Sequence, residues 1–222
     1  IKAALAAQGV DISWTGVSGD DSNALLQGVS IKPAAEKEAL AIGDVKLEGV
    51  TEANGGYEIA TVSTSPFEHS KDGVTLDLSP VVIHDMKVPA EGSTDPLGSL
   101  MMYKSAELSN MTVKVGDKTA FAMDGLAVQI TPPADGKAMD FTANTGKFTA
   151  DLSLIDDPKS KEAIEALGYQ NISGNIAMAG TWQPSDGKME LSKYDISVEN
   201  AGTLGMTFNL GGYTVDFIKS MQ

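Results

Sequence analysis

The sequence predicts a mainly β protein: a strongly twisted antiparallel meander sheet, left as an open groove or partly closed into a barrel, with about three short helices. Many short segments alternate apolar and polar residues between turn signals, as half-buried strands do. In addition, one pattern recurs, in which two apolar residues stand three positions apart and the alternation then resumes. It occurs at Leu26/Val29, Leu47/Val50, Ile83/Met86, Leu108/Met111, Met123/Leu126 and Leu191/Tyr194.

The recurring pattern predicts irregular strands. Residues three apart on a flat strand face opposite sides of the sheet, and one extra residue between them returns both to the same side. We therefore predict a bulge at Ser192-Lys193 that places Leu191 and Tyr194 on one apolar face. The alternative is that each gap marks a strand crossing from one sheet to another. The gaps at Gly28, Gly49 and Gly125 carry the residue that a glycine-type bulge prefers.

The N-terminal elements are a short helix and a hairpin. Residues 1–8 are rich in helix formers and end at Gly9, which suits a helix stop. Alternation predicts a strand at 10–14 and a return strand at 25–31.

Two further strand pairs follow. Asn54-Gly55 is a strong hairpin signal and is expected to join strands at 45–50 and 57–61. Strands are also predicted at 74–78 and 81–88, with Ser79-Pro80 between them at a bend or a sheet edge.

The middle of the chain contains the best candidate for a linker. Residues 89–96 lie between two prolines and lack periodicity. The apolar spacing of 97–103 predicts a short amphipathic helix. Strands are then expected over 106–115 and 120–130.

The last part of the chain combines a hairpin, a helix and a meander. The hairpin is predicted over 138–154, with its turn at 144–146, and a helix over 156–168, capped by Asp and closed by Gly168. Strands at 172–182, 189–198 and 204–210 form the meander. Residues 213–222 predict a terminal helix.

The chain of 222 residues is long enough for one sizeable core or two small ones. We expect a single elongated β-rich domain over 1–222, or two halves, 1–90 and 97–222, that share a sheet. No run of about 18 apolar residues occurs, so no transmembrane span is expected in the residues shown.

The composition argues against several functions. With 30 acidic and 16 basic residues the formal net charge is -14, which makes nucleic acid a poor partner. All the basic residues are lysines, so no guanidinium is present to grip phosphate in bidentate fashion. The absence of cysteine removes disulfides, thiol nucleophiles and the common structural zinc sites.

Catalytic machinery is not evident, and we expect no enzyme, no cofactor and no metal site. His69 and His84 are the only histidines, and no Gly-x-Ser-x-Gly nucleophile elbow occurs. The acidic turn at Asp20 lacks the loop glycine and the distal glutamate of an EF-hand. A metal-assisted hydrolase that uses the acidic turns is the third-ranked hypothesis.

Large adaptable apolar side chains are the candidate ligand-binding residues. Methionine fits varied shapes, and tryptophan offers a wide apolar surface. The alternative is that these side chains form ordinary core. The candidates are Trp14, Met101, Met102, Met178, Trp182 and Met206.

The Leu-x-x-Val-x-Ile pattern at 26–31, the opening segment 9–14 and the segment 167–173 before the meander resemble bacterial AsmA-like and YdgA-like envelope proteins. The resemblance implies a periplasmic protein that had a signal peptide or is anchored by a segment upstream of Ile1. It also implies a curved sheet with a groove for a lipid or for a partner strand. Our first hypothesis is thus a non-enzymatic envelope protein that binds a lipid, an acyl chain or another apolar ligand. The alternative is a structural or protein-interaction module of the envelope with a closed core and no ligand.

Overall fold

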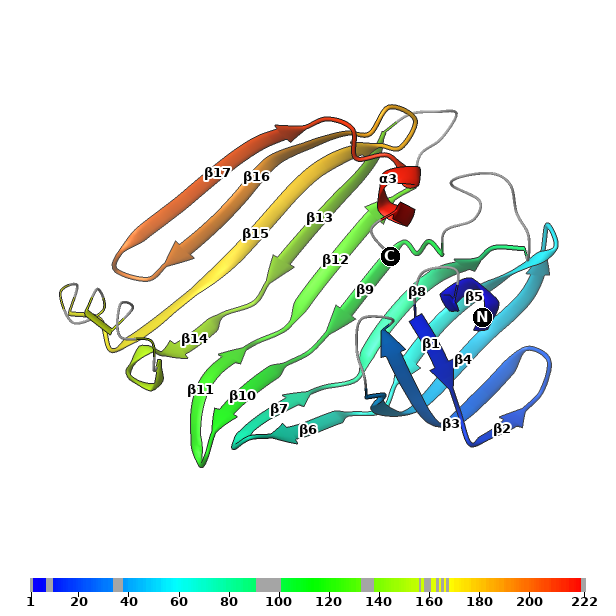
Figure 1. Ribbon diagram of the computed structural model, residues 1–222, viewed down its shortest axis with the longest axis horizontal. Helices are drawn as coiled ribbons and strands as arrows, with labels where there is room; N and C mark the ends of the chain where they lie inside the picture. Colours follow the sequence, from blue (N-terminus) through cyan, green and yellow to red (C-terminus); the bar gives the residue numbers. More distant parts are fainter. Residues whose placement is uncertain are drawn as a thin grey trace.

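The protein forms one large antiparallel sheet that does not close into a barrel (Figure 1). The computed structural model describes residues 2–6, 10–33, 38–90, 101–132, 138–155, 157, 161–162, 164, 166 and 168–220. The prediction of a mainly β, antiparallel meander is confirmed. Of the two forms that the sequence left open, the structure has the open one.

The strands lie across the sheet in chain order, except that some consecutive segments lie end to end and not side by side. The first half holds β1 (Val10–Ser13), β2 (Gly16–Gly19), β3 (Asn23–Pro33), β4 (Leu40–Ala53), β5 (Gly56–Thr64), β6 (Phe67–Lys71), β7 (Val74–Leu78), β8 (Val81–Val88) and β9 (Ser105–Leu108). The second half holds β10 (Met111–Val115), β11 (Lys118–Met123), β12 (Leu126–Thr131), β13 (Met139–Thr145), β14 (Phe148–Asp151), β15 (Asn171–Gln183), β16 (Lys188–Val198) and β17 (Gly202–Leu210). Strand β5, for example, pairs with β4 and β8 and not with β6.

Several consecutive strands are the two halves of a longer, interrupted strand. The consecutive segments β5 and β6 run on in one direction, as do β7 and β8, β9 and β10, β11 and β12, and β13 and β14. Thus β8 pairs with β9 while β7 pairs with β10, and β13 and β14 both pair with β15. The interruptions lie side by side across the sheet, and we call them the break line: Gly28, Gly43, Asp44, Ser65, Pro66, Ser79, Pro80, Ser109, Asn110, Asp124, Gly125, Gly146 and Lys147.

Polar groups replace the interrupted ladder bonds along the break line. The carboxylate of Asp44 accepts a hydrogen bond from the N–H of Gly28 at 2.9 Å. The hydroxyl of Ser79 accepts bonds from the N–H groups of Ser109 and Asn110 at 2.8 and 3.0 Å. Backbone groups along this line that could not pair in a regular ladder are thereby satisfied, so the sheet stays continuous across the interruption.

The predicted bulge at Ser192-Lys193 is confirmed. Leu191 pairs with Phe208 and Tyr194 with Met206 on β17, so β16 carries one residue more than its neighbour at this point. Since Phe208 and Met206 are two apart and share a face, Leu191 and Tyr194 share that face as well. Because all strands belong to one sheet, the alternative of a strand that changes sheets is wrong.

On β4, β5 and β8 the same three-residue spacing is accommodated without a bulge. Gly49, Ala60 and Asp85 lie opposite one another, and the pairing on either side of them shows no offset. Gly49 has φ 66° and Asp85 has φ 52°, a backbone region that favours glycine. Irregularities matched across three strands therefore keep the apolar residues on one face without a change of register.

Two predictions about the strands are wrong. No hairpin turns at 144–146, because β13 and β14 pair with β15 in the same direction and Gly146 lies on the break line. The second arm also ends early, at Asp151, where a short 3-10 turn (Leu152–Leu154) begins. Strand β6 was not predicted, since its sequence Phe-Glu-His-Ser-Lys lacks apolar alternation.

The helices within the described residues are few and short. The described ones include α1 (Lys2–Ala6) and α3 (Val215–Ser220), which lie within the predicted terminal helices. In the predicted helix 156–168, the described residues Lys161, Glu162, Ile164 and Ala166 are helical. The predicted helix 97–103 is wrong where it can be seen: Met102 forms an extended bridge with Lys87, and residues 97–100 lie outside the described part.

The best-buried core lies under the N-terminal strands. Its centre is formed by Val29 and Ile59, which are 0% and 1% exposed. Trp14 and Met101 pack against this cluster from outside the sheet. The buried members of the cluster, which we call the N-terminal core, are Leu26, Val29, Val45, Leu47, Ile59, Val62 and Val88.

Candidate functional site

One line of apolar side chains crosses the sheet from β3 to β17. Direct cross-strand pairing connects each member to the next, and neighbours opposite one another share a face. Val128 on β12 lies between two short side chains, Ala106 on β9 and Ala143 on β13. The side chains therefore project less far from the sheet at this point. We call the line the central row: Ala24, Leu47, Val62, Ile83, Ala106, Val128, Ala143, Met178, Tyr194 and Met206.

Burial decreases along the central row. Leu47 and Val62 are buried in the N-terminal core, Val128 and Met178 are partly exposed, and Met206 is 43% exposed. Along this row the sheet is thus well covered at its first strands and less covered at its last ones, whereas Trp182 and Leu191, beside the row on β15 and β16, are each 6% exposed. A half-exposed apolar face on a folded protein is the kind of surface that binds apolar ligands or partners.

Different elements cover the two ends of the apolar face. At the N-terminal end, the ammonium of Lys2 on α1 lies 4.1 Å from the centre of the Trp14 ring. Near the other end, the indole N–H of Trp182 donates to the carbonyl of Tyr213 at 2.7 Å, and Val215 of α3 is 3% exposed. Figure 1 shows α1 over the N-terminal strands, and α3 follows the segment at Tyr213, which contacts Trp182 of β15 and Gly187.

The structure brings only two of the predicted ligand-binding residues into one line. Met178 and Met206 belong to the central row, with Tyr194 between them. Trp14 and Met101 pack on the N-terminal core, Met102 bridges to Lys87, and Trp182 is buried against Tyr213. The six residues therefore do not form one site.

The sequence-based selection missed the centre of the face. Val128, Ala106 and Ala143 are small or medium-sized and were not selected, because only tryptophan and methionine were sought. The signal was present in the strict alternation of β12, whose partly buried residues Leu126, Val128 and Ile130 alternate with exposed ones.

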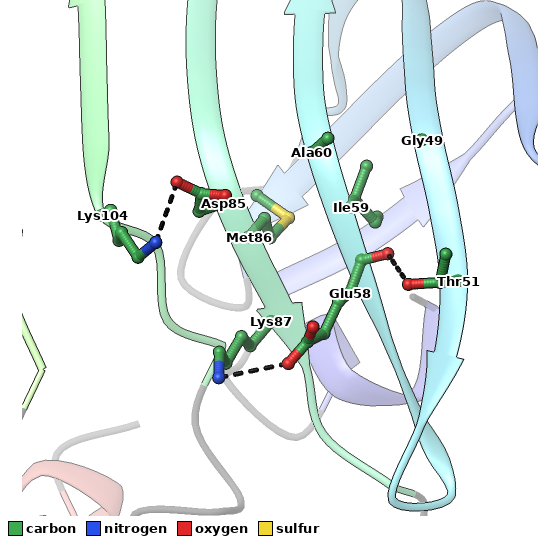
Figure 2. A pocket seen from close by; sticks show the side chains of 9 residues that line it. All are labelled: Gly49, Thr51, Glu58, Ile59, Ala60, Asp85, Met86, Lys87 and Lys104. Atoms are coloured by element: carbon green, nitrogen blue, oxygen red, sulfur yellow. Dashed lines mark hydrogen bonds and ion pairs between the residues drawn. The ribbon is translucent and has the colours of Figure 1, made fainter.

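A polar hollow of about 250 Å³ lies where Gly49, Ala60 and Asp85 face one another (Figure 2). Two ion pairs border it, Lys104 to Asp85 at 3.2 Å and Lys87 to Glu58 at 3.1 Å. All four side chains are at least half exposed, so their charges are already paired and well solvated. The hollow is smaller than typical ligand pockets, and a small polar solute fits it better than an acyl chain.

The two histidines, the only ones in the chain, lie apart from any catalytic arrangement of described residues. The Thr61 hydroxyl lies 3.5 Å from Nδ1 of His84, at the outer limit for a hydrogen bond, and His69 stacks on Phe67. Among the residues with described positions, no group of three or more His, Cys, Asp or Glu side chains could hold a metal ion.

The acidic turns use their carboxylates to hold the backbone. Asp20 accepts hydrogen bonds from the N–H groups of Ser22 and Asn23, and these bonds lower its pKa. The N–H of Lys188 does the same for Asp186 and lowers the pKa of that carboxyl. Such turns explain the local structure without a bound cation.

The pair Lys114–Asp77 joins β10 to β7 and makes the stability depend on pH. The Nζ of Lys114 donates a hydrogen bond to the Asp77 carboxylate at 2.8 Å. This bond lowers the pKa of Asp77 below 3.8 and raises the pKa of Lys114 above 10.5. A lowered carboxyl pKa stabilises the fold above the unfolded pKa, and this stability is lost as the pH falls through the folded pKa. The Lys114 contribution is lost at the other extreme, as the pH rises through its folded pKa.

We therefore expect Asp77→Asn to reduce the loss of stability on acidification below a pH of about 3.8. Urea unfolding of wild type and variant at a series of acidic pH values measures this. Asp117→Asn, which removes a carboxylate from an exposed turn, serves as the control. Equal pH dependence of the Asp77 and Asp117 variants would show that the pair with Lys114 does not contribute.

Within the described residues, no helix is long and apolar enough to cross a membrane. Comparison with known proteins found no matching family model, no matching curated protein and no matching solved structure.

Proposed function

We propose that the protein is a non-enzymatic binding protein that holds a lipid, an acyl chain or another apolar ligand on its apolar face. The observation that carries the proposal is the central row, an uninterrupted apolar line whose burial decreases toward β17. An extended acyl chain matches such a line in shape and chemistry. Each methylene removed from water contributes about 0.8 kcal/mol, so even a partly covered face can bind a chain of moderate length.

The ligand would lie across β9, β12 and β13, where Ala106 and Ala143 leave the face low on either side of Val128. The two covered ends, the Trp14 region and the Trp182 region, would limit how far it extends. The periplasmic location that the resemblance implies remains a prediction.

Ligand binding is tested by native mass spectrometry and by titration. Protein purified without detergent is expected to carry a copurified apolar molecule, and the ligand-free protein to bind a fluorescent fatty acid. If no apolar molecule copurifies and no fluorescent fatty acid binds, the proposal is overturned.

The site is tested by a pair of neighbouring substitutions on β12. Val128→Lys is expected to weaken fatty-acid binding about tenfold or more. A tenfold change in Kd corresponds to a binding free energy of about 1.4 kcal/mol, and burying an ammonium group under the ligand costs more than that. Gln129→Lys adds the same charge at an exposed position on the opposite face and should leave binding unchanged. Circular dichroism confirms that both variants fold. Equal binding by the two variants would place the ligand elsewhere.

A further inference from the structure

Strand β17 is an unusual edge. Within the described residues it pairs with β16 alone, and all nine of its residues are exposed. Its sequence Gly-Thr-Leu-Gly-Met-Thr-Phe-Asn-Leu has no charged residue and no proline, the residues that commonly protect sheet edges from pairing. The apolar members are Leu204, Met206, Phe208 and Leu210, which are 43–59% exposed.

The surroundings of β17 are electrically neutral. The charged residues of β16 are Lys188, Glu190, Lys193 and Asp195, two positive and two negative, and β17 adds none. The whole chain carries a formal net charge of -14. Two copies of this acidic protein would therefore meet with little local repulsion along β17.

We propose that β17 pairs antiparallel with β17 of a second copy, centred on Met206. In this register Met206 lies opposite its counterpart, Leu204 lies opposite Phe208, and Gly202 opposite Leu210. It is the arrangement that pairs all nine residues while keeping every apolar side chain on the same face. The two central rows would then join into one longer apolar surface.

A second copy fits better than a head-to-tail chain of copies. Among the described residues, the other free edges are short: β1 and β2, each of four residues and separated at Trp14 and Thr15, and β6, of five residues, which pairs with β7 alone. None of them can match the nine residues of β17, whereas β17 matches itself. Pairing of like edges closes as a twofold dimer and leaves no free β17.

The dimer is expected to be concentration-dependent and favoured by salt. One strand pair buries less than the roughly 800 Å² per partner of a standard interface, so the association should be weak. At 0.1 M salt the Debye length is about 10 Å, so the repulsion between two acidic copies of the protein is screened. The contact along β17 has no charged residue and is not weakened by this screening.

Sedimentation velocity over a concentration series tests the dimer. We expect a monomer–dimer equilibrium that shifts toward dimer with added salt. Met206→Lys places two like charges opposite each other and should weaken association about tenfold or more. Leu204→Lys, at the 59% exposed position, should weaken it too and is the safer variant for folding. Val115→Lys, the same charge change at an exposed position on β10, should leave it unchanged.

Single cysteines test the register, because the wild-type chain has none. Under mild oxidation Met206→Cys should form a disulfide-linked dimer, since directly opposite Cβ atoms lie about 4.5–5.5 Å apart. Thr207→Cys should not, because the two copies of residue 207 would be diagonal neighbours about 7–8 Å apart. A chain that remains monomeric at its highest soluble concentration, or a dimer that Met206→Lys leaves intact, overturns the proposal; selective binding of another protein by β17 in a monomeric chain does so as well.

Discussion

Ile59→Ala is expected to destabilise the protein by about 2–5 kcal/mol, the usual cost of removing a large aliphatic side chain from a well-packed core. Ile59 is 1% exposed and pairs with Val50 on β4 and Met86 on β8. The rigid pairing on both sides limits how far the neighbours can collapse into the space. Equilibrium urea unfolding monitored by circular dichroism measures the change.

Leu204→Ala is the matched control for this prediction. It also shortens a large aliphatic residue to alanine, but at a position that is 59% exposed on β17. A change within about 0.5 kcal/mol is expected there, as for most surface substitutions. Similar losses in the two variants would contradict the placement of Ile59 in a well-packed core and of Leu204 on the surface.

The unequal burial of the sheet has a physical origin in its coverage. A single sheet must bury one face against another layer, and here the described covering elements are short. Near the N-terminal core, β1, Trp14 and Met101 supply the second layer. Toward β17 the cover is limited to Tyr213 and α3 near Trp182, and the same alternation of apolar residues leaves the side chains of β17 exposed.

Sequence reasoning could predict the strand pattern and the bulge because both depend on local chemistry. The spacing of Leu191 and Tyr194 requires an extra residue if both are to face one core, and the register confirms it. Alternation alone could not decide whether the sheet closes. Closure depends on whether the first and last strands meet, and no residue of β17 encodes that.

The wrongly predicted turn at 144–146 and the unpredicted strand β6 both depend on pairing that local sequence does not reveal. A Gly-containing polar segment such as 144–146 has the same composition whether the chain reverses or only interrupts its pairing. Conversely, β6 is held by pairing with β7 next to the Asp72-Gly73 turn and needs no apolar face of its own. Whether a segment turns or forms a strand is decided here by its pairing partners, which are distant in sequence.

The candidate ligand residues are spread over the sheet for a different reason. Selecting tryptophan and methionine favoured residue type over position, and Trp182 proved to be buried against Tyr213. The central row is defined by register, and register is fixed only when all the pairings are known. Met178 and Met206 are the two candidates whose register places them in the central row.

The break line should be intolerant of added volume, and Gly146→Ala is the sharpest test. A Cβ at Gly146 would meet the backbone carbonyl oxygen of Asp124, and the Asp124 carbonyl carbon at 2.8 Å. The adjacent backbone bonds, Gly146 to Gly125 at 3.1 Å and Asp124 to Lys147 at 2.8 Å, hold these segments together. Backbone cannot move aside as a flexible side chain can. We therefore expect a destabilisation of about 3 kcal/mol, the upper end for overpacked sites.

Two control substitutions separate the clash from other effects of replacing glycine. Gly211→Ala has no atom within 4 Å of the added Cβ and should be nearly neutral. Gly116→Ala also has free space but sits at φ 57°, so it should cost only the about 1–2 kcal/mol of the left-handed conformation. If Gly146→Ala unfolds in urea like Gly211→Ala, the strands on either side of the break line are free to separate. If it unfolds earlier than both controls, close contact between β11/β12 and β13/β14 is what keeps the apolar face continuous across the break.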